Sequence, residues 1–340
     1  MQLSEAIQQV IDRHDLTQPQ MNDVMSQIMS GQATDAQIGG FLVGLAMKGE
    51  SVDEISAAAK VMRDLSSKVE IGVDHLVDTC GTGGDGASIF NVSTASAFVC
   101  AAAGAHVAKH GNRSVSSKTG SADLLEYAGV RLGLASEQVA DCVRQLGVGF
   151  MFAPAHHSAM KHAIGPRKEM GVRTVFNLLG PLTNPASTPN QVLGVFSKDW
   201  VEPMAQVLKS LGSQHVMVVH SEDGLDEISV AAPTHVAELK GGEVRAWTLD
   251  PADYGVNRSS LEGLAALDVA DSYRLVMNAL NGVPGPEADI VALNAGAAIY
   301  VSGIADSLEA GIQAARDVMG SSEAAQRLSA LAAMTQGFDQ

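Results

Sequence analysis

The segment DTCGTGGDG, residues 78–86, decides the fold class of this chain of 340 residues. It follows a short β-prone run, Leu76 to Asp78, and precedes a helical stretch predicted over residues 91–103. Glycines in such a turn let backbone N–H groups approach a phosphate, and the helix presents its positive end to the same anion. The sequence therefore predicts a strand, an anion-binding turn and a helix, as in α/β domains.

The same glycines also match the dinucleotide fingerprint GxGxxG, from Gly81 to Gly86, but the match is weak by itself. A dinucleotide site needs an acidic residue about 20 positions further on, and none occurs between Asp85 and Asp123. No GK[ST] follows, so the turn is not a P-loop. A tight turn without any ligand stays open as an alternative at this point.

Beyond residue 70, short β-prone runs alternate with helical stretches, which predicts an α/β domain. The predicted strands are residues 192–196 and 216–219, and a hairpin joins 235–239 to 244–249 around Gly241 and Gly242. The predicted helices lie at 136–146, 200–211, 270–280 and 288–301.

Before residue 67 the apolar residues recur at helical spacing in four sets, and Ser51 with Glu54 forms a capping box ahead of the fourth. We expect a helical domain over residues 1–70 and an α/β domain over residues 71–340, with a later segment near residues 165–185 as a candidate to pack against the helical domain. Met-rich stripes on so small a module favour packing against the same chain or a second subunit, which predicts a dimer contact.

Composition excludes several classes of function. Hydrophobic residues make up 46% of the chain and the net charge is −16, which indicates a soluble globular protein that repels nucleic acid and anionic lipid. Residues 87–108 lack charged side chains, but their polar residues argue against a membrane span. The three cysteines, Cys80, Cys100 and Cys142, show no CxxC spacing, and we expect a cytoplasmic protein.

A positive segment follows the glycine turn. Residues 86–122 contain Lys109, Arg113 and Lys118 and no carboxylate. We expect a strand at His106 to Ala108 and, after it, one loop whose cationic, amide and hydroxyl donors suit a phosphate. This island is large enough to attract a small anionic substrate and too small for a duplex.

Two further charged segments carry opposite signs. PRKEMGVR, residues 166–173, offers an arginine that could hold a carboxylate. EDGLDE, residues 222–227, holds four carboxylates after the predicted strand 216–219 and fits a solvated acidic turn as well as a Mg²⁺ site. The histidines at 156, 157 and 162 lack a zinc pattern, so we expect them to line a substrate. Taken together, these parts describe transfer of a phosphoribosyl group from a pyrophosphate ester.

The strings GTGGDG, NVSTAS, KHGNRSVSSKTGSAD, RTVFNLLGPLTNP and GLDEIS, in this order, resemble the anthranilate phosphoribosyltransferase family over nearly the whole chain. The resemblance implies the type-III phosphoribosyltransferase fold, which pyrimidine nucleoside phosphorylases share, with a small helical domain hinged to a larger α/β domain. It also implies a homodimer, Mg²⁺ as cofactor, and the second step of tryptophan biosynthesis from chorismate, with phosphoribosyl diphosphate and anthranilate as substrates.

The resemblance also implies site residues in this chain. Contacts to phosphoribosyl diphosphate fall on Gly81, Gly84, Asp85, Asn91, Val92, Ser93, Thr94, Lys109, His110, Gly111, Asn112, Arg113, Ser114, Val115, Ser116, Ser117 and Ser121. Contacts to anthranilate fall on Gly81, His110, Asn112, His157, Arg167, Gly180 and Pro181, and Mg²⁺ ligands on Ser93, Asp226 and Glu227. One departure is Ile89, where many family members carry a hydroxyl residue.

Two alternatives remain beside this expectation. A nucleoside phosphorylase of the same fold would use inorganic phosphate, and the Asp226 and Glu227 pair argues against it. A non-catalytic nucleic-acid-binding relative would need basic stripes, which the net charge of −16 disfavours. No Asp–His or Cys–His pair nominates a general base, and an aromatic amine, already neutral at pH 7, does not demand one, so no catalytic residue is expected and positioning carries the reaction.

Overall fold

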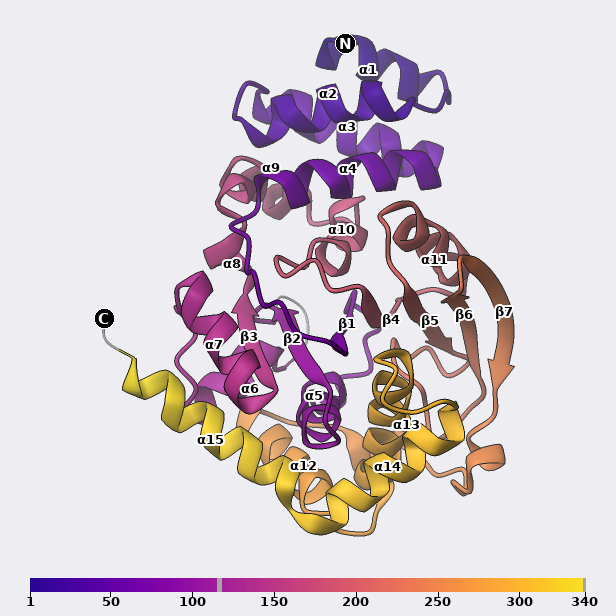
Figure 1. Ribbon diagram of the computed structural model, residues 1–340. Coiled ribbons are helices and arrows are strands. Elements are labelled where there is room, and N and C mark those ends of the chain that lie inside the picture. Colours follow the sequence, from indigo (N-terminus) through magenta and orange to yellow (C-terminus); the bar gives the residue numbers. More distant parts are fainter. Residues whose placement is uncertain (115–117, 339–340) are drawn as a thin grey trace.

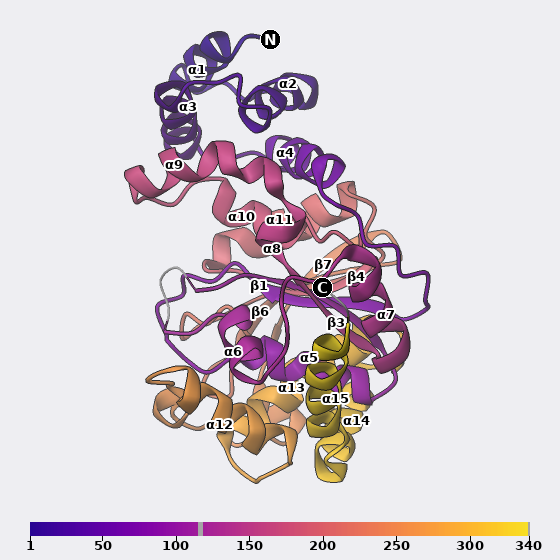
Figure 2. The ribbon, with the colours of Figure 1, turned by 90° about the vertical axis from the view of Figure 1, so that its left-hand side faces the viewer.

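A computed structural model gives the structure of residues 1–114 and 118–338. Helices lie on both sides of a central sheet, and the N-terminal helices form a separate layer at one end (Figure 1). In the view turned by 90° the sheet lies between these N-terminal helices and the C-terminal ones (Figure 2). The N-terminal layer consists of α1 (Leu3–Ile11), α2 (Gln18–Met29), α3 (Asp35–Lys48) and α4 (Val52–Leu65).

In the described residues the sheet has seven strands in the order β3-β2-β1-β4-β5-β6-β7. The first five in this order are parallel, and β6 and β7 add an antiparallel hairpin at one edge. The strands are β1 (Leu76–Gly81), β2 (His106–Gly111), β3 (Val148–Phe152), β4 (Asn190–Gly194), β5 (His215–Ser221), β6 (Thr234–Lys240) and β7 (Glu243–Leu249).

The order of the strands reverses between β1 and β4. From β1 the chain proceeds outward through β2 and β3, then returns to place β4 on the other side of β1. Helices that follow strands on the two sides of such a point diverge, which leaves a crevice at the carboxyl ends of the two strands. In this chain those ends are Gly81 and Gly194, which are register partners. The topology therefore predicts a ligand site at Gly81 and Gly194.

The remaining helices cover both faces of the sheet. Those that pack on the face away from the N-terminal layer, or along the β3 edge, are α5 (Val92–Ala102), α6 (Ser121–Tyr127), α7 (Ser136–Leu146), α12 (Val269–Leu280), α13 (Pro286–Val301), α14 (Leu308–Ser321) and α15 (Glu323–Gly337). Between the sheet and the N-terminal layer lie α8 (Ala153–His156), α9 (Lys161–Met170), α10 (Phe176–Leu182) and α11 (Val201–Ser210). Short 3₁₀ turns occupy η1 (Ser158–Met160), η2 (Lys198–Trp200), η3 (Pro251–Tyr254) and η4 (Leu261–Leu264).

Two hydrophobic cores meet at the sheet, because successive side chains of a strand point to opposite faces. On β5, Val216 and Val218 join the core that the N-terminal helices also enter, whereas Met217 and Val219 join the core beneath α5 and α13. The N-terminal layer thus shares its core with one sheet face. α9 packs against α2 and α3, and α10 packs against α4. The division of the chain near residue 70 stays a prediction.

The capping box predicted at the start of α4 is present. Glu54 N donates to Ser51 Oγ at 3.3 Å, and Ser51 N donates to Glu54 Oε2 at 2.8 Å. The Glu54 carboxylate also accepts from Leu16 N at 2.9 Å and from Lys48 Nζ at 2.9 Å. Because Glu54 is fully buried, these donors offset the cost of removing its charge from water. One side chain therefore joins the start of α4 to the loop before α2.

The fold confirms the predicted helical and α/β layers, and several element bounds differ. β2 runs to Gly111, so Lys109, His110 and Gly111 are strand residues and the predicted end at Ala108 was wrong. β1 likewise runs to Gly81, three residues beyond its predicted end at Asp78. Strand β3 and helices α6, α8, α9, α10, α14 and α15 were not predicted. Among the described residues no helix is long and apolar enough to span a membrane.

Candidate active site

The glycine turn and the acidic segment meet at the crevice beside β1 and β4. Gly83 N donates a hydrogen bond of 2.8 Å to Asp226 Oδ2, across 143 positions of sequence. A Cβ atom on Gly81 would lie 2.4 Å from Asp226 Oδ2, and one on Gly194 would lie 1.6 Å from the Asp226 carbonyl oxygen. Glycine at both strand ends is therefore what lets Asp226 approach so closely.

The carboxylates of this segment lie against other negative charge. Burial, and then the neighbouring Asp85, raise the pKa of Asp226, while the N–H of Gly83 lowers it. Burial and Asp226 raise the pKa of Glu227 well above its ordinary value, against the opposing effect of Lys109 and the Ser93 N–H. Such crowding favours a cation at this position.

Lys109, the cation that lowers the pKa of Glu227, is buried in β2, with 3% of its surface exposed. Its ammonium group donates to the carbonyl of Thr79 and to Ser93 Oγ, the latter at 3.2 Å. Burial lowers the pKa of Lys109, and Asp78 and Glu227 oppose that shift. Lys109 therefore binds the start of α5 from within strand β2 and does not lie in a loop as predicted.

The sequence-predicted ligands Ser93, Asp226 and Glu227 fit Mg²⁺. The Ser93 N–H acts to lower the pKa of the Glu227 carboxyl, and Asp226 lies at the glycine turn. Mg²⁺ takes one or two carboxylates and completes its shell with water and substrate phosphates. Within residues 1–114 and 118–338 no group of three or more His, Cys, Asp or Glu side chains could hold a metal ion. Two carboxylates are too few to fill the coordination shell of Mg²⁺, so this donor set suits a cation that also binds a phosphate ligand.

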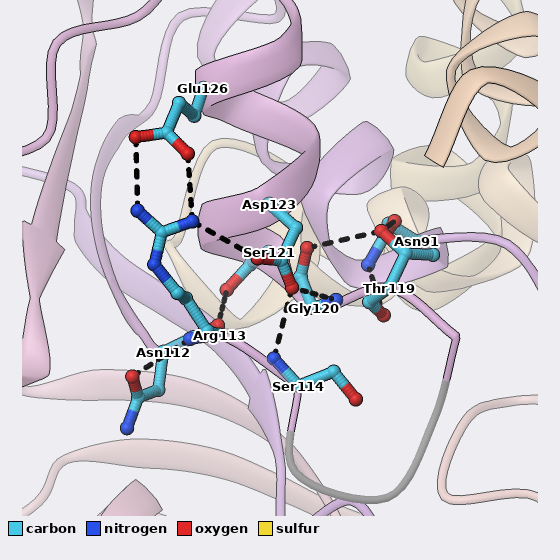
Figure 3. Close-up of polar contacts among 9 residues, drawn as sticks. All are labelled: Asn91, Asn112, Arg113, Ser114, Thr119, Gly120, Ser121, Asp123 and Glu126. Atoms are coloured by element: carbon cyan, nitrogen blue, oxygen red, sulfur yellow. Dashed lines mark hydrogen bonds and ion pairs between the residues drawn. The ribbon is translucent and has the colours of Figure 1, made fainter. Parts of the chain in front are cut away.

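The start of α5 is hydrogen-bonded to Thr119, which belongs to the segment predicted as a phosphate-binding loop after residue 108. Asn91 Oδ1 accepts hydrogen bonds from Ser272 Oγ at 2.8 Å and from Thr119 Oγ1 at 3.2 Å. Figure 3 shows Asn91 and Thr119 facing each other beside this segment. Thr94 Oγ1 is buried without a partner among the described residues. Ile89 pairs through its backbone with Ala265.

The Asp123 carboxylate accepts hydrogen bonds from Ser114 and Gly120 in this loop, and the Arg113 side chain points toward Glu126 (Figure 3). Asp123 Oδ2 accepts from Ser114 N at 3.0 Å and from Gly120 N at 2.9 Å. The Arg113 guanidinium binds both oxygens of Glu126, at 2.7 and 2.9 Å. The expected positive island is therefore partly neutralised by carboxylates that follow it directly. The predicted contacts Val115, Ser116 and Ser117 lie outside the described residues.

Asn112, Gly111 and Ser121 lie where β2 gives way to α6. Asn112 Oδ1 accepts from Arg113 N at 2.8 Å, and Ser121 Oγ donates to the Asn112 carbonyl at 3.4 Å. A Cβ on Gly111 would come within 2.2 Å of Ser121 Oγ. The structure therefore brings these three predicted residues together.

Two buried imidazoles lie side by side. The rings of His110 and His157 are 5.1 Å apart, and Gly180 lies against His110. Burial, with a contribution from His157, lowers the pKa of His110 to about 3, and burial lowers that of His157 to about 4. Neither Nε2 atom has a hydrogen-bond partner among the described residues. Both imidazoles are therefore neutral near pH 7 and retain a polar atom for a ligand.

Arg167 lies on α9, with its guanidinium carbon 4.9 Å from the centre of the Phe176 ring. Burial lowers its pKa. In the described part of the chain the structure shows no ion pair or hydrogen bond for this guanidinium. A half-buried cation without a carboxylate suits an anionic ligand.

Pro181, another predicted anthranilate contact, lies on α10, and its carbonyl accepts a hydrogen bond of 2.8 Å from Gln191.

Sequence reasoning missed Gly194 and Arg173. Arg173 donates to the carbonyl of Gly84 in the glycine turn and lies 4.4 Å from the centre of the Phe196 ring. Arg173 lies in the segment 166–173 that was predicted to offer an arginine for a carboxylate, but the resemblance assigned Arg167 alone and no contact to the glycine turn was predicted. Gly194 carries no sequence signal of its own.

Comparison with known proteins shows the family to which this chain belongs. Residues 4–66 match the glycosyl transferase family helical bundle domain, and residues 73–325 match the glycosyl transferase family a/b domain. Anthranilate phosphoribosyltransferase of Marinomonas sp. (strain MWYL1) is 62% identical over 99% of this chain and 98% of the relative. That of Thioalkalivibrio sulfidiphilus is 61% identical over 98% of this chain and 99% of the relative.

Solved structures give the same result. The crystal structure of anthranilate phosphoribosyltransferase from Thermus thermophilus superposes with a TM-score of 0.93 and 42% identity, covering 98% of this chain and 99% of that one. The Saccharomyces cerevisiae enzyme in complex with PRPP and Mg superposes with a TM-score of 0.89 and 26% identity, covering 99% of this chain and 98% of that one. This chain belongs to the anthranilate phosphoribosyltransferase family.

Proposed function

We propose that this chain transfers the phosphoribosyl group of 5-phosphoribosyl 1-diphosphate to the amine of anthranilate, in the presence of Mg²⁺, as the second step of tryptophan biosynthesis. The observation that supports this best is the contact of Asp226 with the glycine turn, at the point where the strand order reverses. The names of the relatives and the yeast complex support the same reaction.

In this proposal the glycine turn and the start of α5 bind the diphosphate, and Ser93, Asp226 and Glu227 hold Mg²⁺. The metal, when bound, neutralises charge on the departing diphosphate. The anthranilate amine forms the new C–N bond as the C–O bond to diphosphate breaks on the opposite face, and water takes the amine proton. His110 and His157 line the acceptor as neutral groups, and backbone N–H groups stabilise the leaving anion.

A direct assay tests this reaction. Mixing the protein with anthranilate, phosphoribosyl diphosphate and Mg²⁺ should make the fluorescence of anthranilate fall with time, because its amine becomes substituted. The same mixture with EDTA, and one with inorganic phosphate and a nucleoside in place of the substrates, should show no reaction. Turnover of the nucleoside instead would overturn the proposal.

Arg167→Ala should raise the KM for anthranilate by about 10- to 100-fold and leave kcat close to that of the parent, because a charged hydrogen bond contributes about 1.5–3 kcal/mol. The half-buried guanidinium stacks on Phe176 and suits the anthranilate carboxylate. Lys168→Ala, an exposed position on the same helix, is the matched control. An unchanged KM in Arg167→Ala would show that other residues hold the carboxylate.

We also propose a homodimer formed through the N-terminal helices. The outer side of α3 and the end of α1 expose Ile11 (61%), Val43 (38%) and Met47 (70%). Exposed apolar side chains grouped on adjacent helices are typical of subunit contacts. The homodimer would bury these side chains.

Val43→Glu combined with Met47→Glu should convert the dimer into a monomer, because the two charges would be buried in the contact. Light scattering after size-exclusion chromatography measures the mass. Leu267→Glu, at a residue that is 78% exposed elsewhere on the molecule, is the control and should leave the mass unchanged. If the double variant keeps the mass of the parent dimer, the contact lies on another surface.

We also propose that the enzyme works in the cytoplasm, a proposal that the chemistry of the cysteines supports. Cys80, Cys100 and Cys142 are all free thiols. Burial raises the pKa of each thiol, which keeps them protonated and unreactive. These properties support the proposal that the enzyme works in the cytoplasm.

A further inference from the structure

The acidic pair lies in an irregular loop. β5 ends at Ser221 and β6 begins at Thr234, so the peptide groups between them cannot be paired within the sheet. Buried backbone N–H and C=O groups need partners, and in irregular segments side chains supply many of them. The partners of this loop therefore decide where Asp226 and Glu227 point.

One side chain binds both polar groups of the residue after the pair. Asn294 Oδ1 accepts from Ile228 N at 2.9 Å, and Asn294 Nδ2 donates to the Ile228 carbonyl at 2.9 Å. The second hydrogen of the same Nδ2 group binds the carbonyl of Ile290, also at 2.9 Å. Asn294 is 2% exposed, and Ile228 is fully buried. The amide thus fixes the backbone of Ile228 to helix α13.

The position of Asn294 connects this contact to the site. Asn294 and Glu227 line the same small cavity, together with Ser93 and Ser96. Gly81 and Gly194 lie against Asp226. The acidic pair is therefore held from two directions, by the two glycines at the strand ends and by one amide on α13.

A second group of contacts holds the loop further from the pair. Ser229 Oγ donates to Asp223 Oδ2 at 2.5 Å, and Ser229 N donates to Thr234 Oγ1 at 3.2 Å. These bonds shape the turn into β6, and they bind the residue after Ile228. Asn294 is thus the side chain that binds the peptide groups on both sides of the Ile228 α-carbon, directly after Glu227.

We propose that Asn294 is a positioning residue for the metal site: by binding the N–H and C=O of Ile228, its amide sets the direction of the Asp226 and Glu227 carboxylates. The inference rests on the proposed function of these two residues. Groups that orient metal ligands typically change metal affinity by about 10- to 100-fold when they are removed. Loss of the amide should therefore weaken the binding of the metal more than the binding of anthranilate.

The test measures Mn²⁺ binding to the full-length chain by electron paramagnetic resonance, with phosphoribosyl diphosphate present. Asn294→Ala should raise the Kd for Mn²⁺ by about tenfold or more, with the KM for anthranilate unchanged. Asn294→Ser, which removes less volume and keeps a hydroxyl group, should raise the Kd by a smaller factor, and it serves as the test if Asn294→Ala does not fold. The melting temperature of each variant is recorded beside its Kd.

Asn190→Ala is the matched control. Asn190 is also buried and donates from Nδ2 to the carbonyl of Leu76 at 3.0 Å, but it lies at the other end of β4 from Gly194. Its variant should lose stability and keep the parent Kd for Mn²⁺. An unchanged Kd in a folded Asn294 variant, or an equal rise in Asn190→Ala, would overturn the inference. A parent chain that binds no Mn²⁺ would instead overturn the proposed function on which it rests.

Discussion

Replacing Asp226 by Asn and Glu227 by Gln in one chain should lower kcat by about a thousandfold at saturating anthranilate and low Mg²⁺. Removing a single group that stabilises developing charge costs roughly 100- to 1,000-fold, and this variant removes both carboxylates proposed to hold the metal. The amides keep the size of the parent side chains, and the amide that replaces the Asp226 carboxylate could still accept the Gly83 N–H through its oxygen. The loss should therefore come from charge and not from shape.

The stability of the same variant separates this effect from unfolding. Both carboxyls have folded-state pKa values raised by burial and by neighbouring acids, so above those values their ionised forms destabilise the folded chain. Neutral amides remove that penalty, and the melting temperature at pH 8 without metal should equal or exceed that of the parent. Glu222→Gln, at an exposed residue of the same segment, is the control. If the double variant has the same kcat as the parent, Asp226 and Glu227 do not hold the metal.

Gly194→Ala should lower kcat/KM by about a hundredfold, which is the effect expected when a reacting group is misplaced by about 1 Å. The added Cβ would lie 1.6 Å from the carbonyl oxygen of Asp226 and 2.5 Å from its carbonyl carbon, so the acidic segment must move. Alanine is allowed by the backbone at this strand position, which leaves the steric contact as the cause. Overpacking of this kind also costs about 1–3 kcal/mol of stability.

The control for this variant is Gly133→Ala, because nothing lies within 4 Å of a Cβ added there. Steady-state kinetics with both substrates, and the Mg²⁺ dependence of the rate, give the readout. We expect Gly194→Ala to need a higher Mg²⁺ concentration than the parent for its half-maximal rate, and Gly133→Ala to need the same concentration as the parent. A Gly194→Ala enzyme with the parent kcat/KM would show that the position of Asp226 does not matter for turnover.

The layers of the fold and the place of the site could be predicted from local patterns. Four sets of apolar residues at helical spacing predicted the N-terminal helices. The run from Leu76 through the glycine turn predicted a strand, a turn and a helix, and only the helix, α5, lies close to its predicted bounds, because β1 continues to Gly81. The hairpin around Gly241 and Gly242 follows from turn chemistry, and both glycines have positive φ, 59° and 80°. These features depend on residues that are close in sequence.

Polar residues inside buried strands misled the prediction. The β2 strand was expected to end before Lys109, because a lysine followed by His110 and Asn112 is typical of a loop. In the structure Lys109 is buried because the Thr79 carbonyl, Ser93 and the acidic groups around it offset the cost of burying its charge. Those partners come from other segments, so the local sequence could not reveal them.

The charge of the positive segment and the roles of Gly194 and Asn294 were missed for different reasons. The charge of the positive segment was counted only as far as Ala122, and the carboxylate that holds Ser114 and Gly120 belongs to the next residue, Asp123. Gly194 and Asn294 matter because of what approaches them, the Asp226 backbone in one case and the Ile228 backbone in the other. A close approach between distant segments has no signature in a single sequence.

Anomalous diffraction from crystals of the chain soaked with phosphoribosyl diphosphate and Mn²⁺ shows directly whether Asp226 and Glu227 hold the metal beside the diphosphate. We expect a manganese peak within coordination distance of a carboxylate oxygen of Asp226 or Glu227, with the diphosphate against the glycine turn at residues 81–86. A diphosphate bound in that turn with its manganese away from both carboxylates would contradict it.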